Sequence, residues 1–247
     1  MSFNNYKINK SKIYNNNIEF YEDKVNSYNF INNLNIKIPN IYFILNNIDE
    51  LYNIKLPNYC VIKYNNLASS KGIIIKELNK YKNCFNNIFN NFNDAINYLK
   101  NNNKQSKYCQ ESIKNIKQKI IIEELLYPSN NNILYDIKCY TINSKITHIA
   151  IINPNNRKET YSVDKNFNRL NYDKRDINYL NKIFEKPKYF DDIINYCEII
   201  LKKLNFDILR IDFYSTTIGA VFGEFTFNPG VSFLPEIDKF FYDILIN

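Results

Sequence analysis

Two short segments near the C-terminus alternate charged and apolar residues. Residues 208–213 read ILRIDF and residues 222–226 read FGEFT, so Arg210 and Asp212 share one strand face, as do Glu224 and Thr226. A hairpin symmetric about Ile218 would place Asp212 opposite Glu224 and Arg210 opposite Thr226. Two facing carboxylates repel each other, and a hard divalent cation such as Mg²⁺ resolves that repulsion. The alternative is two surface-facing acids, one of them paired with Arg210.

A polar loop earlier in the chain offers groups that bind phosphate. Residues 65–72 read NNLASSKG and lie between two apolar runs, 59–63 and 73–76, which predict the strands of a hairpin. The hydroxyls of Ser69 and Ser70 and the backbone around Gly72 can face phosphate oxygens, and Lys63 adds a positive charge at the end of the first strand. The alternative is an ordinary solvated hairpin loop.

Two adjacent acids interrupt an apolar run. Glu123 and Glu124 lie within residues 120–126, IIIEELL. Because a buried carboxylate needs a partner, we expect either the hydrogen-bonding edge of a ligand or a neighbouring lysine beside them.

The rest of the chain predicts the elements that position these residues. Apolar spacing predicts helices over 21–34, 93–100 and 191–204, and further strands over 41–45, 134–142 and 146–152, the last two joined in a hairpin at Asn143-Ser144. Antiparallel hairpins with a few helices indicate an α+β fold. Glycine-rich Rossmann and P-loop motifs are missing from the sequence, which argues against those phosphate sites.

Composition excludes several classes of protein. The chain has 247 residues, a net charge of +7, five cysteines and one histidine, His148. The cysteines lack the spacing of a zinc site, and His148 lies in an apolar run that predicts a strand residue rather than a base. We expect reduced thiols in a cytoplasmic protein, without a secretory signal or a membrane span. The lysines are dispersed, so the charge alone is weak support for a nucleic-acid partner.

The order of these segments resembles the ATP-grasp superfamily and, within it, the teichuronopeptide-biosynthesis (TupA-like) branch. The resemblance runs from Asp23 to about Asp238. The similar segments are Asp23-Lys24, residues 59–63, the 69–72 loop, residues 121–126, Asp136-Ile137-Lys138, Lys186-Pro187, Arg210-x-Asp212, residues 222–226 and Pro229-Gly230. Thr226 stands where most ATP-grasp ligases have Asn, as is usual for this branch.

The resemblance implies a role for each site residue. Phosphates of the nucleotide are bound by Lys24, Lys63, Ser69, Ser70 and Gly72, adenine by Glu123, Glu124, Leu125 and Leu126, and ribose by Asp136. The metal site comprises Asp212, Glu224 and, through a bound water, Thr226. The catalytic residues are Arg210, Lys138 and Arg157.

The implied fold is an α+β ATP-grasp fold with two sub-domains and the nucleotide bound between antiparallel sheets. Its expected regions are an abbreviated N-terminal region with the opening helix (1–57), a small sub-domain with the phosphate loop (58–125) and a large sub-domain with the metal site (126–247).

The implied activity uses ATP and Mg²⁺ to join a carboxylate to an amine through an acylphosphate, in cell-surface polysaccharide or polypeptide biosynthesis. The expected substrates are small molecules or glycans, with no nucleic acid. Two alternatives remain: a kinase-like ATP-grasp phosphotransferase acting on a sugar or alcohol, and a catalytically silent nucleotide-binding scaffold.

Overall fold

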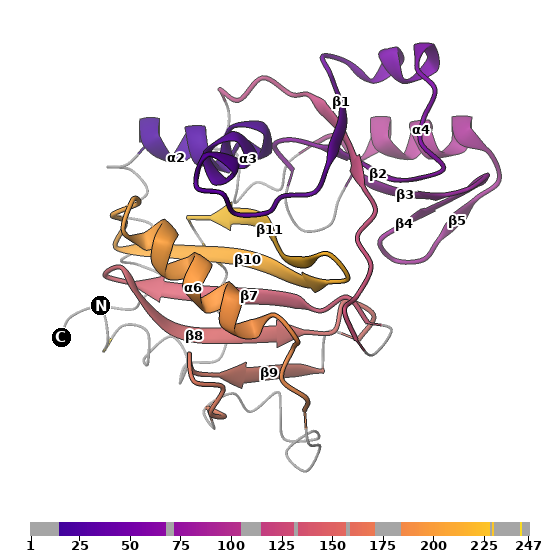
Figure 1. The fold of residues 1–247 in the computed structure, drawn as a ribbon. Helices are drawn as coiled ribbons and strands as arrows, with labels where there is room; N and C mark the ends of the chain where they lie inside the picture. The colour runs from indigo at the N-terminus through magenta and orange to yellow at the C-terminus, as the bar shows by residue number, and fades with distance from the viewer. Residues whose placement is uncertain are drawn as a thin grey trace. The chain divides into compact units, whose positions relative to one another are not determined.

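The computed structural model describes residues 15–67, 72–104, 115–130, 133–156, 159–170, 184–227, 229 and 243. The chain divides into two compact units (Figure 1). The six-stranded unit comprises Glu19–Tyr28 and Pro39–Leu126, and the five-stranded unit comprises Asn29–Ile38, Tyr127–Asn247 and the chain up to Ile18. The division into regions 1–57, 58–125 and 126–247 remains a prediction. Residues of the first of these regions occur in both units.

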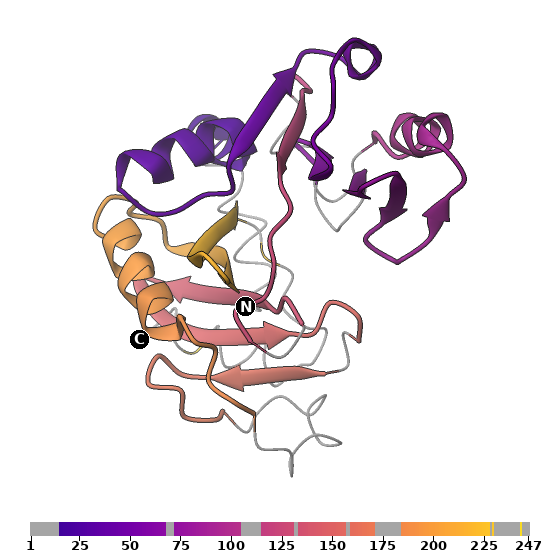
Figure 2. The same cartoon turned by 45° about the vertical axis from the view of Figure 1, so that its right-hand side comes forward.

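The six-stranded unit is one antiparallel sheet in the order β1-β6-β2-β3-β4-β5. Its elements are β1 (Ile41–Leu45), the 3₁₀ helix η1 (Ile48–Asn53), β2 (Tyr59–Tyr64), β3 (Ile73–Glu77), β4 (Lys80–Asn83), β5 (Ile88–Phe89), α4 (Phe92–Asn101) and β6 (Ile120–Glu124). Figure 2 shows β1 and β6 side by side, although 74 residues separate Leu45 from Ile120 in the sequence. The predicted hairpin of β2 and β3 is confirmed.

The two faces of this sheet have different environments. In β2, Cys60, Ile62 and Tyr64 are buried in a core with the apolar face of α4, whereas Val61 and Lys63 are half-buried on the other face. Strand alternation therefore separates an apolar packing face from a face that carries Lys63.

The predicted helix over 21–34 is wrong in one respect, because the structure has two helices there. Helix α2 (Asn15–Glu22) ends before Asp23, and α3 (Lys24–Asn33) begins after it. The Asp23 carboxylate accepts a hydrogen bond from the backbone N–H of Val25, with 2.8 Å between Oδ1 and N. A side chain that satisfies the free N–H groups of a first turn favours a helix start at that point. Asp23 thus precedes the first residue of α3, Lys24.

The five-stranded unit is an antiparallel sheet in the order β11-β10-β7-β8-β9. Its elements are β7 (Asp136–Ile142), β8 (Lys145–Ile152), β9 (Thr160–Val163), α6 (Phe190–Leu201), β10 (Ile208–Thr216) and β11 (Gly219–Thr226). Helix α6 lies across one face of this sheet (Figures 1 and 2) and buries the predicted apolar stripe, including Ile193, Cys197 and Ile200. The helix ends at Leu201, three residues before the predicted end.

The register of β10 and β11 is the predicted one, with Asp212 opposite Glu224 and Arg210 opposite Thr226. The turn is tighter than predicted, because Thr216 already pairs with Gly219, whose φ is +124°. The pairing is regular from the turn as far as Phe213 and Phe222. If it continued in the same way, the next pair would be Asp212 and Gly223. A β-bulge at Gly223 adds one residue and brings Glu224 opposite Asp212.

Gly223 suits this bulge because there is little space for a side chain. A Cβ atom at this position would lie 2.9 Å from Cε2 of Tyr214 and 3.2 Å from the backbone oxygen of Asp212. The Tyr214 ring and the backbone of Asp212 therefore favour glycine here.

The structure also shows the surroundings of the histidine and of three cysteines, and the character of the helices. His148 is a buried residue of β8 that packs edge-to-face on Tyr140, as a strand residue would. Cys60, Cys139 and Cys197 are buried thiols. Within the described part of the chain, no helix has the length and apolar character needed to cross a membrane.

Candidate functional site

Lys63 and Glu123 form an ion pair on the half-buried face of the six-stranded sheet. They lie on neighbouring strands β2 and β6, and 2.5 Å separates Lys63 Nζ from Glu123 Oε1. Tyr28 of α3 completes the group: its hydroxyl donates to Glu123 Oε2 at 3.0 Å and accepts from Lys63 Nζ at 2.8 Å. We call Tyr28, Lys63 and Glu123 the balanced cluster, because it holds one positive and one negative charge. Of the two partners expected for Glu123, a ligand edge or a lysine, the lysine is therefore present.

Glu124, the second acid of the pair, points elsewhere. Its Oε2 atom accepts a hydrogen bond from Nδ2 of Asn40 at 3.0 Å, and its backbone N–H bonds to the carbonyl of Asn40. Since successive strand residues face opposite sides, only Glu123 faces Lys63. Leu125 and Leu126 follow the strand and are half-buried, so a role for their backbone in binding adenine stays a prediction.

The start of α3 is fastened to the end of β2. Asn65 is fully buried, donates to Asp23 Oδ2 at 3.0 Å and accepts at Oδ1 from the backbone N–H of Lys119 at 2.8 Å. Lys24 is also buried, and its Nζ donates to the carbonyl of Leu67 at 2.8 Å. Lys24 thus lies at the base of the predicted phosphate loop. Asn65 was missed by sequence reasoning because asparagine is abundant in this chain.

The predicted phosphate loop is described only at its ends. Ser69 and Ser70 lie outside the described residues. Gly72 has φ +61°, and a Cβ there would lie 2.8 Å from both Leu67 Cδ1 and Tyr64 Cδ2. Glycine is needed at this position both for its left-handed backbone and for lack of space.

The five-stranded sheet carries a second group of charges around Asp212. Arg210 contacts Asp212 through two nitrogens, with Nε 2.6 Å from Oδ1 and Nη2 2.8 Å from Oδ2. Lys138 of β7 lies opposite Asp212 on the other side of β10, and its Nζ is 2.6 Å from Oδ2. Asp212 is only 3% exposed. The alternative of a surface-facing acid is therefore wrong for Asp212, although its pairing with Arg210 is correct.

Two further carboxylates adjoin this group. Glu224 Oε1 is 3.7 Å from Arg210 Nη2, and Asp136 Oδ2 is 3.6 Å from Lys138 Nζ. We call Asp136, Lys138, Arg210, Asp212 and Glu224 the acidic cluster, because three carboxylates face two cations. Asp136 lies beside Lys138; its predicted contact with ribose stays a prediction.

Burial and charge act in opposite directions on Asp212. Burial would raise the pKa of its carboxyl group, but the attraction of Arg210 and Lys138 outweighs burial and lowers that pKa below its usual value. Burial likewise opposes the charge on Lys138, yet Asp212 and the other carboxylates raise the pKa of the ammonium group. These groups are thus held charged by one another.

The acidic cluster can supply part of a magnesium site. Asp212 and Glu224 offer oxygen ligands on adjacent strands, and Thr226 lies opposite Arg210 at the next position on this face. Among the described residues, no group of three or more His, Cys, Asp and Glu could hold a metal ion by itself. Mg²⁺ commonly takes one or two carboxylates and completes its shell with water and substrate phosphates, so these oxygens fit that ion.

The positions of Arg157 and Lys186 remain to be compared with the sequence predictions. Arg157, the third predicted catalytic residue, lies outside the described residues. Lys186 pairs with Asp191 at the start of α6, with 2.6 Å between Nζ and Oδ1. Tyr28 was missed because its spacing with Val25 and Ile31 fits an ordinary apolar helix face.

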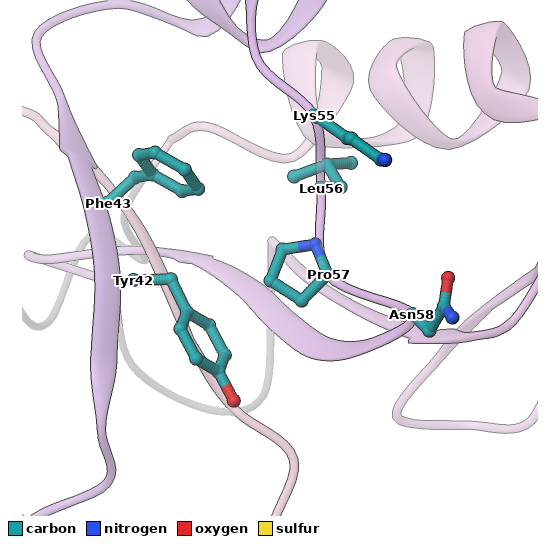
Figure 3. A pocket seen from close by; sticks show the side chains of 6 residues that line it. All are labelled: Tyr42, Phe43, Lys55, Leu56, Pro57 and Asn58. Carbon is teal, nitrogen blue, oxygen red and sulfur yellow. The ribbon is translucent and has the colours of Figure 1, made fainter.

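A cavity of about 380 Å³ occurs elsewhere in the six-stranded unit (Figure 3). Tyr42 and Phe43 of β1 line one side, and the chain from Lys55 to Asn58 lines the other. Phe43 pairs with Ile122, which precedes Glu123 on β6. Because successive strand residues face opposite sides, Phe43 and Glu123 lie on opposite faces of the sheet. None of the residues that line this cavity is a predicted site residue.

Comparison with solved structures identifies the fold class. The chain is similar to D-alanine–D-alanine ligase from Helicobacter pylori, with TM-score 0.57 and 16% identity over 92% of this chain and 60% of that one. It is also similar to D-alanine–D-alanine ligase from Bacillus anthracis, with TM-score 0.50 and 16% identity over 92% of this chain and 66% of that one. The chain thus spans less than two thirds of each ligase. No curated protein matches it.

The two antiparallel sheets with few helices and these likenesses define an ATP-grasp fold, as expected. The family model described as TupA-like ATPgrasp matches residues 4–246. The chain therefore belongs to the TupA-like ATP-grasp family.

Proposed function

We propose that the protein is an ATP-dependent carboxylate–amine ligase that works through an acylphosphate. The observation that supports this most is the pairing of Asp212 with Glu224, braced by Arg210 and Lys138, in a chain of an ATP-grasp family. Phosphoryl transfer depends chiefly on positioning and on charge stabilisation, and this group of side chains offers both.

In this proposal the six-stranded unit contributes the nucleotide contacts except that of Asp136, which lies on β7 of the five-stranded unit. Lys63 and Lys24 supply positive charge for the phosphates, with the backbone and hydroxyls of Ser69, Ser70 and Gly72. Glu123 and the chain through Glu124, Leu125 and Leu126 read adenine, and Asp136 binds ribose. Support comes from the contact of Lys63 with Glu123 and from Lys24 at the base of the loop.

The acidic cluster holds Mg²⁺ in this proposal. Asp212 and Glu224 are its ligands, and Thr226 acts through a bound water. The ion would neutralise charge on the phosphates. Arg210 stabilises negative charge that develops on the transferred phosphoryl group, while Lys138 and Arg157 bind the reacting oxygens.

The proposed reaction has two steps. A carboxylate oxygen of the first substrate attacks the γ-phosphorus of ATP, and the bond to the β-phosphate oxygen breaks to release ADP. The amine of the second substrate then attacks the acyl carbon, inorganic phosphate leaves with the bonding electron pair, and the nitrogen loses a proton.

The biological setting is a separate part of the proposal. Membership of the TupA-like family supports an acceptor used in cell-surface polysaccharide or polypeptide biosynthesis, a small molecule or glycan. The buried thiols of Cys60, Cys139 and Cys197 support a cytoplasmic, reducing location.

The test is ADP release with Mg-ATP over panels of carboxylates and amines, supplied separately and together. A ligase releases ADP and forms a new amide only with a competent pair, or slowly with the carboxylate alone. ADP release with an alcohol alone would indicate a phosphotransferase, and ATP binding without turnover would indicate a scaffold. Lys63→Ala is the control, since it should abolish ADP release that originates from this protein.

A further inference from the structure

Tyr28 connects the two charged residues of the balanced cluster and has no assigned role. Its side chain is 2% exposed, and its ring also lies beside the Lys63 ammonium, 5.4 Å from Nζ to the ring centroid. The three residues come from α3, β2 and β6, so they meet only in the folded unit.

The chemistry of the three side chains determines the direction of each hydrogen bond. An ammonium group only donates and an ionised carboxylate only accepts. The Tyr28 hydroxyl must therefore accept from Lys63 and donate to Glu123. Lys63 spends two of its three N–H groups on Tyr28 and Glu123, which leaves one for another acceptor.

Glu123 is thereby held as an acceptor with a fixed orientation. One carboxylate oxygen faces Lys63 and the other faces Tyr28, and with these partners among the described residues each oxygen can accept one more hydrogen bond. An acceptor in a buried site favours a partner with an N–H group and disfavours a second acceptor, because the wrong partner leaves both groups without a hydrogen bond.

We propose that Tyr28 is a positioning residue that makes the nucleotide site selective for a 6-aminopurine over a 6-oxopurine. It acts through Glu123, whose fixed carboxylate accepts from an exocyclic amino group and repels a carbonyl oxygen. The inference rests on the proposed function, because it assumes that the balanced cluster faces the base of ATP.

The test compares the affinities of the full chain for Mg-ATP and Mg-GTP by calorimetry. Tyr28→Phe keeps the ring and removes the hydroxyl, so we expect ATP affinity to fall about five- to tenfold, which is the typical net effect of one lost hydrogen bond. GTP affinity should change little, so the ratio of the two affinities should fall by a similar factor.

Tyr64→Phe is the matched control. Tyr64 is a buried tyrosine of the same unit whose hydroxyl donates to the carbonyl of Leu99 at 3.2 Å, on the packing face of the sheet. Its loss should lower the melting temperature as much as Tyr28→Phe does, yet leave the ratio of ATP to GTP affinity unchanged.

A double-mutant cycle with Glu123→Gln tests whether Tyr28 acts through Glu123. Glutamine can also donate, so Glu123→Gln alone should lower the selectivity, and Tyr28→Phe should then lower it little further. If wild-type protein prefers ATP and Tyr28→Phe leaves the ratio unchanged, the inference is overturned while the proposed function stands. If wild-type protein binds neither nucleotide, both are overturned.

Discussion

The balanced cluster and the acidic cluster each surround a buried carboxylate on an antiparallel strand, Glu123 and Asp212, but their charges balance differently. In the balanced cluster Lys63 meets a single carboxylate and a tyrosine hydroxyl. In the acidic cluster the three carboxylates of Asp136, Asp212 and Glu224 face the two cations of Arg210 and Lys138. One group is neutral as a whole, and the other has a net negative charge.

This difference indicates what each group is suited to bind. Removing ions from water is costly, so a buried group with uncompensated charge is more stable when a counter-ion joins it. The excess negative charge of the acidic cluster therefore favours a cation, whereas the balanced cluster favours a neutral partner read by hydrogen bonds. Four substitutions test this distinction, in order of decreasing expected effect.

The largest effect is expected for Asp212→Asn. The substitution removes a buried carboxylate and leaves the half-buried Arg210 and Lys138 without their shared negative partner, so the free energy of unfolding should fall by about 3 kcal/mol in the absence of Mg²⁺. Urea denaturation measures this loss. Repulsion between Asp212 and Glu224 alone would instead make the change neutral or stabilising.

Asp191→Asn is the control for this change. Asp191 pairs with Lys186 at a similar distance, 2.6 Å, but its side chain is 76% exposed. Its loss should cost less than about 1 kcal/mol. Equal losses at the two positions would show that Asp212 does not anchor a buried cluster.

Glu224→Gln should separate metal binding from stability. Glu224 is further from Arg210 than Asp212 is, so stability should change by less than about 1 kcal/mol. The Mg²⁺ concentration for half-maximal ADP release should rise on the order of a hundredfold, as for a lost carboxylate ligand. An unchanged Mg²⁺ requirement would remove Glu224 from the metal site.

Gly223→Ala tests how the register of the acidic cluster is maintained. The added methyl group would contact Tyr214 and the backbone of Asp212, so the free energy of unfolding should fall by about 2 kcal/mol. Denaturation of Gly223→Ala in a Tyr214→Leu background is the companion measurement. If the contact with Tyr214 is the cause, the loss should be smaller there.

The smallest effect is expected for Thr226→Val, which keeps the shape of the side chain but removes the hydroxyl. If Thr226 holds a water on the metal, the Mg²⁺ concentration for half-maximal ADP release should rise about tenfold, and Thr226→Ser should restore it. Failure of serine to restore it would mean that packing, rather than the hydroxyl, is responsible.

The sequence predicted local features well, because they depend on neighbouring residues. The alternation of residues 208–213 and 222–226 correctly predicted which side chains share a strand face. The apolar stripe of α6 correctly predicted that this segment is a helix and which side of it is buried. The break between α2 and α3 was missed, although Asp23 is a strong helix-capping residue. A continuous apolar spacing concealed that local signal.

By itself, the sequence determined which residues can carry charge, which strand face each occupies and where the predicted phosphate loop begins. Only the tertiary structure decided the partners. Lys138 reaches Asp212 across 74 positions of the chain, and Tyr28 reaches Glu123 across 95. Even the correct pairing of Asp212 with Glu224 depends on the bulge at Gly223, because a shift of one residue would turn every side chain of β11 to the other face. Alternation is a property of neighbouring residues, whereas register and ion pairing follow from how distant strands pack.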